Sequence, residues 1–155
     1  MLKKEVQTLK EIKFLDNEGD LETFEKIINK LAYEEDVNLI KDLCEIFDDE
    51  VSSIEGLDLV SDTIFYISDR IGKRKGLLEL LRGFKLMFPH AEEWILIINI
   101  RILNSEIWTK EYKRAIHELN NSEKKIIVDI LEEIKSYESE YIEKFNEIIS
   151  ELLKK

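Results

Sequence analysis

The chain has 155 residues, 44% of them hydrophobic, and carries a net charge of −11. That length suits a single domain over residues 1–155 with a sizeable core, and one proline with five glycines leaves few turn formers for a β-rich fold. A lone cysteine, Cys44, excludes a disulfide framework and favours a reducing compartment. We therefore expect an all-α, cytoplasmic protein.

Apolar residues recur every three or four positions in the N-terminal third, which predicts amphipathic helices. The first runs from about Lys4 to Leu15 and stops at residues 16–20, DNEGD, where Gly19 can take the backbone angles of a helix end. Asp20 and Asp36 are expected to cap the next two helices. The inward stripe of the third helix consists of Leu39, Ile40, Leu43, Ile46 and Phe47.

The middle of the chain continues this pattern on both sides of Gly72. A fourth helix is expected over Ile54 to Ile71, and a fifth over Lys73 to Met87. Pro89 suits the first turn of a sixth helix. That helix contains residues 94–98, WILII, and is apolar on nearly every side, which predicts a buried central helix too short to cross a bilayer.

Three further helices are expected, near residues 106–119, 122–135 and 138–152, which makes about nine in all. No strand-like alternation competes with them. Short connections favour antiparallel helical hairpins, stacked as a short α-solenoid of the HEAT-like kind or packed as an irregular helical bundle. The chain has no internal sequence repeat that decides between the two.

The charge is distributed unevenly. Between Glu34 and Asp62 eleven acidic residues face Lys41 alone, whereas residues 70–85 carry six basic residues and one glutamate. Helical spacing turns acids outward on both the third and the fourth helix. Such a surface attracts a basic protein and repels nucleic acid, although a solvated face is the simpler alternative. The predicted partner-binding residues are Asp42, Glu45, Asp48, Asp49, Glu50, Glu55, Asp58, Asp62 and Tyr66.

No pattern in the sequence indicates catalysis or a cofactor. Asp48, Asp49 and Glu50 are contiguous, unlike the alternating ligands of a calcium loop, and such a run at a helix end usually points into water. Neither histidine follows a glutamate at the spacing of a di-iron site, and Cys44 lies in an apolar stripe. We therefore expect a protein that is not an enzyme and holds no metal or cofactor.

Three stretches carry a family resemblance: LIKDLCEIFDDE (residues 39–50), GLDLVSDTIFYI (56–67) and AEEWILIINIRILNSE (91–106), with Tyr112 beyond. Over roughly Leu21 to Ile134 the sequence resembles the immunity protein 30 family of bacterial polymorphic toxin systems. The resemblance implies an all-helical cytoplasmic protein that binds and neutralises the toxin domain encoded beside it. From the acidic charge and the short apolar run, we expect neither nucleic acid nor a membrane as a partner. An acidic surface would suit a basic toxin. The alternative is a helical-repeat adaptor for another basic or helical partner.

Overall fold

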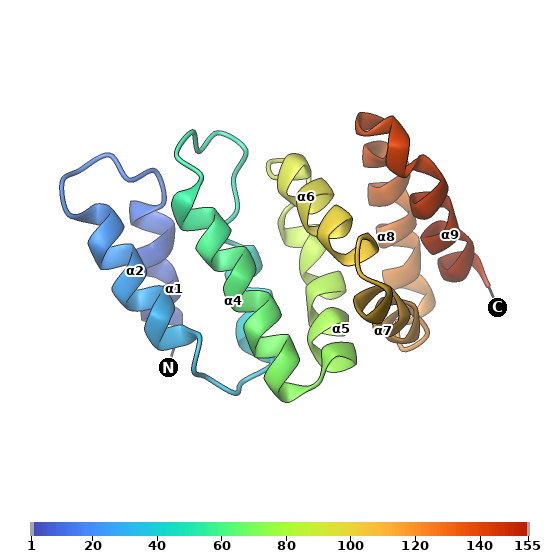
Figure 1. The fold of residues 1–155 in the computed structure, drawn as a ribbon, viewed down its shortest axis with the longest axis horizontal. Coiled ribbons are helices and arrows are strands. Elements are labelled where there is room, and N and C mark those ends of the chain that lie inside the picture. Colours follow the sequence, from blue (N-terminus) through green and yellow to red (C-terminus); the bar gives the residue numbers. More distant parts are fainter. Residues whose placement is uncertain (1, 155) are drawn as a thin grey trace.

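The computed structural model describes residues 2–154, and every regular element in that range is a helix (Figure 1). Short 3-10 turns cover Phe84–Leu86, Lys135–Tyr137 and Ser139–Tyr141. The expected all-α fold with about nine helices is confirmed. The α-helices are α1 (Lys3–Ile12), α2 (Asp20–Leu31), α3 (Asn38–Cys44), α4 (Glu55–Ile71), α5 (Lys73–Gly83), α6 (Glu92–Leu103), α7 (Glu106–Ile116), α8 (Asn121–Ile134) and α9 (Ile142–Leu153).

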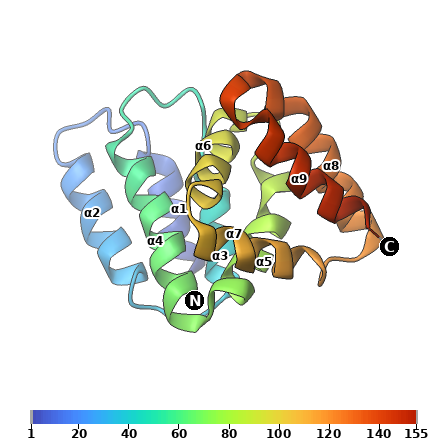
Figure 2. The ribbon, with the colours of Figure 1, turned by 45° about the vertical axis from the view of Figure 1, so that its right-hand side comes forward.

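The helices stand in a row, from α1 and α2 at one end to α8 and α9 at the other (Figure 1). Neighbours in sequence run in alternating directions and pack against each other, as in α4 with α5 and α8 with α9. In Figure 1, α4 lies in front of α3, so the row is two layers deep there. Figure 2 shows α7 crossing the row below α6. Short connections thus produced the expected antiparallel helical array.

The helix α5 is the one around which the row is built, because it packs against α3, α4 and α7. Two of its glycines permit this close approach. A Cβ atom on Gly76 would overlap Ser68 of α4, and one on Gly83 would lie 2.5 Å from the Cys44 sulfur of α3. Any larger residue at either position would push the neighbouring helix away.

The apolar side chains form one buried cluster that extends from Val6 in α1 to Leu152 in α9. The predicted inward stripe of the third helix is buried, and so is Cys44. Trp94 is only 4% exposed, and its ring lies 5.2 Å from that of Phe47.

The sixth helix is less enclosed than its sequence suggests. Trp94, Ile98 and Ile102 are buried as expected, but Ile97 is 46% exposed. One side of α6 therefore borders on solvent, and α5 occupies the central place in the row instead.

A buried polar pair joins α6 to α7. The Tyr112 hydroxyl donates a hydrogen bond to Asn99 Oδ1 at 2.6 Å, and the Asn99 side-chain amide donates to the Ile95 carbonyl at 2.8 Å. Both side chains are buried, and hydrogen bonds inside the protein replace those that their polar groups would make to water.

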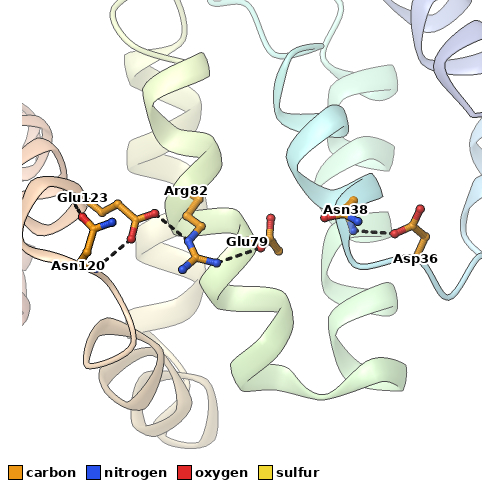
Figure 3. A network of polar contacts seen from close by, with 6 residues as sticks. All are labelled: Asp36, Asn38, Glu79, Arg82, Asn120 and Glu123. Carbon is orange, nitrogen blue, oxygen red and sulfur yellow. Dashed lines mark hydrogen bonds and ion pairs between the residues drawn. The ribbon is translucent and has the colours of Figure 1, made fainter.

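Arg82 ties α5 to the C-terminal helices (Figure 3). Its Nε lies 2.8 Å from Glu123 Oε2, and its Nη1 lies 3.3 Å from Glu79 Oε1. Glu123 also accepts the Asn120 backbone N–H while the Asn120 side chain accepts that of Glu123, which forms a capping box at the start of α8. One glutamate thus both starts α8 and holds it against α5.

Several helix ends differ from the sequence predictions. The first helix ends at Ile12, because Leu15 adopts a positive φ of 55°. Asp20 accepts the Asn17 N–H and does not cap α2, whereas Asp36 accepts the Asn38 N–H at the start of α3 as expected (Figure 3). Pro89 lies in a turn before α6, which begins at Glu92.

Replacing Gly83 with alanine should lower the free energy of unfolding by about 1–3 kcal/mol, because the added methyl overlaps the Cys44 sulfur. The same substitution should cost less in a Cys44→Ala background, where that sulfur is gone. Urea unfolding of the wild type, both single variants and the double variant measures the coupling. Additive losses across the four proteins would show that this contact does not set the distance between α3 and α5.

Candidate functional site

The acidic residues predicted on the third helix face α1. Asp42 and Glu45 share a shallow hollow with Lys3 and Lys10, and the Lys10 ammonium lies 3.8 Å from Glu45 Oε1. Partial burial, followed by the neighbouring Glu45 carboxylate, raises the pKa of Asp42. This stripe is therefore partly neutralised by the lysines of α1.

The acidic residues predicted on the fourth helix point away from the core along α4. We call Glu55, Asp58, Asp62 and Tyr66 the α4 face. Tyr66 is 57% exposed, which is unusual for a side chain of its size. Partial burial and the nearby Asp62 carboxylate raise the pKa of Asp58, and no ion pair to Asp58 occurs within residues 2–154.

An arginine from another helix completes this surface. The Arg101 guanidinium of α6 lies 2.8 Å from Asp62 Oδ1 and 4.1 Å from the centre of the Phe65 ring. This pairing holds α6 beside α4. It also leaves Asp62 less available to a partner than Asp58.

The two predicted acidic stripes do not form one surface. Asp42 and Glu45 line a hollow with lysines of α1, whereas Asp62 of α4 pairs with Arg101 of α6, so the two stripes lie beside different helices. Helical spacing correctly predicted the exposed residues Glu55, Asp58 and Tyr66 of α4, whereas Asp42 and Glu45 are only partly exposed beside α1. It carried no information about the relative placement of the two helices.

Asp48, one of the predicted partner-binding residues, also makes contacts that stabilise the fold. Its carboxylate lies 3.2 Å from the Lys13 ammonium, just after α1, and Oδ1 accepts the Glu50 N–H at 3.0 Å. Burial opposes ionisation of Asp48, but these two partners outweigh it and hold the pKa of the carboxyl below its usual range.

Asp49 caps a helix far away in the sequence. Its Oδ2 accepts the Glu93 N–H of α6 at 3.0 Å, and its own N–H donates to the His90 carbonyl at 3.0 Å. Ala91 precedes α6 and has no side-chain acceptor, so Asp49 supplies the cap that this helix start lacks. Of the three consecutive acids, only Glu50 is exposed. The run does not simply point into water.

The basic stretch of residues 70–85 is largely engaged in internal pairs. Lys73 pairs with Asp69, and Arg74 lies 3.2 Å from Glu118 Oε2. Arg82 holds the two glutamates already described. Much of the positive charge of this stretch is thus neutralised within the fold.

Sequence reasoning missed a hollow of about 570 Å³ at the start of α6, which we call the α6 groove. It lies between α6 and the connection from α8 to α9. The paired acids at positions 92 and 93 were visible in the sequence, but their nearness to Asp49 and to residues 137–138 arises only in the fold. The groove is lined by Asp49, Glu92, Glu93, Leu96, Ile97, Tyr137 and Glu138.

Two side chains with reactive groups, Cys44 and His117, are buried or paired. Cys44 is fully buried, and that burial raises the pKa of its thiol and keeps it protonated. His117 Nε2 lies at the surface, 3.0 Å from Glu151 Oε2. Within residues 2–154 no group of three or more potential ligands could hold a metal, and no helix is long and apolar enough to span a bilayer.

Comparison with known families gives one result. The family model described as immunity protein 30 matches residues 11–112, which are 102 of the 155 residues. All three stretches that carry the resemblance lie inside this range, although the match starts and ends earlier than the span from Leu21 to Ile134. No curated protein and no solved structure matches the chain significantly.

Replacing Asp49 with alanine should lower the free energy of unfolding by about 0.5–2 kcal/mol, because the Glu93 N–H loses its cap. Glu50→Ala is the matched control. It removes an exposed carboxylate from the adjacent position and should change stability by less than about 0.5 kcal/mol. Urea unfolding compares the two variants, and equal losses would contradict the capping role.

Proposed function

The chain belongs to the immunity protein 30 family, and from this premise we propose that it binds and neutralises the toxin domain encoded beside it. An immunity protein acts by binding, so its partner is a protein. The observation that carries the proposal is the family match over residues 11–112, which includes the whole α4 face and the whole of α6.

We place the toxin on the α4 face and not on the α3 side. Asp58 and Glu55 are exposed there beside Tyr66, whereas Asp42 and Glu45 already share their hollow with two lysines. An exposed tyrosine is the kind of side chain that dominates interface energetics, since it buries a large area with little loss of conformational freedom.

The charge of Asp58 supports a basic partner. Although Asp58 is exposed, partial desolvation and the nearby Asp62 carboxylate raise its pKa and so disfavour its ionised form in the free protein. A lysine or arginine of the toxin, placed at hydrogen-bond distance, would offset this effect and favour the carboxylate. Unpaired carboxylates at the rim of the contact would mainly speed association and make it sensitive to salt.

The alternative function, a helical-repeat adaptor, would use the same binding surface but would not neutralise a toxin. A row of helical hairpins is also typical of adaptors that present an extended surface. An adaptor would bind its partner without abolishing the partner's toxicity, so neutralisation separates the two functions.

Co-expression with the neighbouring toxin domain should restore growth to cells that the toxin alone arrests. The purified proteins should form a stoichiometric complex, and toxin activity should disappear once the two are equimolar. Growth and toxin activity are the two measurements. Arrest that persists in cells containing the folded chain would contradict the proposed function.

Tyr66→Ala should weaken toxin binding by about 2 kcal/mol or more, roughly 30-fold in Kd, mainly through faster dissociation. Asp58→Asn should slow association several-fold at low salt and have less effect at high salt. Asp42→Asn is the matched control, because it neutralises an aspartate of similarly raised pKa on α3. Surface-binding kinetics against the immobilised toxin measure all three. If Asp42→Asn slows association and Asp58→Asn does not, the toxin lies on the α3 side.

A further inference from the structure

The α6 groove combines an apolar floor with acidic walls. Ile97 and Tyr137 are each 46% exposed, and Leu96 is buried beneath them. Glu92, Glu93 and Glu138 stand around this floor. Two large, half-exposed hydrophobic side chains in one hollow leave apolar area in contact with water, and a partner would cover it.

The acids of the groove lack internal counter-charges. Within residues 2–154, no lysine or arginine forms an ion pair with Asp49, Glu92, Glu93 or Glu138, in contrast to Asp48, Asp62 and Asp69. Glu92 instead accepts the Tyr137 hydroxyl at 2.9 Å, a bond that raises the pKa of Tyr137 and holds its ring at the edge of the groove. The negative charge collected here is therefore available to a ligand.

Asp49 supplies a second and independent sign of a missing partner. Its Oδ2 is fixed by the Glu93 N–H, while its Oδ1 is buried and has no hydrogen-bond partner. A buried carboxylate oxygen without a donor is costly, and such atoms are rare in folded proteins. Asp49 also lines the groove, and the cap fixes the position of its carboxylate.

From these observations we propose that the α6 groove binds a basic segment of the toxin, in which a lysine or arginine is next to an apolar residue. The cationic group would lie among Asp49, Glu93 and Glu138. Its aliphatic stem and the apolar neighbour would pack on Ile97 and Tyr137. The inference rests on the proposed function, because the toxin is the partner that it names.

The groove adjoins the α4 face. Arg101 lies one turn beyond Ile97 on α6 and pairs with Asp62 of α4. A toxin bound at Asp58 and Tyr66 would therefore also lie beside α6. A basic segment of this toxin would extend past Arg101 into the groove. The two surfaces together would present one extended, mainly acidic interface.

Charge reversal and apolar truncation of groove residues test this inference. The measurement is the binding of each variant to the toxin domain that is encoded beside this protein. Glu93→Lys and Ile97→Ala should each weaken binding by about tenfold or more. Asp129→Lys is the matched control, since it makes the same kind of charge change at an exposed position of α8 outside the groove, and it should alter Kd by less than about twofold. Circular dichroism melts confirm that each variant is folded.

The outcomes separate this inference from the proposed function. Tight binding by the wild type with loss in both groove variants supports the inference. Tight binding by the wild type and equally tight binding by both groove variants would overturn the groove and leave the function standing. No binding by the wild type would overturn both.

A photo-cross-linking residue in place of Ile97 identifies what enters the groove. With p-benzoylphenylalanine at this position, irradiation of the complex should attach a toxin peptide that contains lysine or arginine, as read by mass spectrometry. A cross-linked peptide without basic residues, or a stable complex with no cross-link, would overturn the inference.

Discussion

The close approach of α3 and α4 to the backbone of α5 is the constraint on which the rest of this structure depends. It requires glycine at two positions of α5, Gly76 against Ser68 and Gly83 against Cys44. Where no side chain separates the helices, dispersion contacts are dense and the helix positions are tightly defined. With α3 and α4 held by the same helix, the acids of α3 lie beside α1 and Asp62 of α4 lies beside α6.

The proposed function depends on which carboxylates this arrangement leaves unpaired. Asp48 is used to hold Lys13 after α1, and Asp49 to start α6. Within residues 2–154, the carboxylates without an ion pair include Asp58 on the α4 face and the glutamates around Ile97 in the α6 groove. The acidic composition therefore has two roles. Some acidic residues connect segments that are far apart in the sequence, and others form the surface that we propose for the toxin.

Periodicity predicted the helices and their inward stripes well, because a helix buries every third or fourth residue whatever lies opposite it. It did not predict contacts between distant segments, such as Asp49 with Glu93 or Asp62 with Arg101. Those pairs depend on how helices are placed side by side, which the pattern of one helix does not encode. Ile97 shows the same limit, since a helix apolar on nearly every side still has a residue at the solvent boundary.

Amide hydrogen exchange of the free protein and of its complex with the neighbouring toxin domain tests the central claim most directly. The account predicts that the toxin slows exchange in peptides from α4 and from the start of α6, with little change along α1 and the outward side of α3. Protection confined to α1 and α3, with α4 and α6 unchanged, would contradict it.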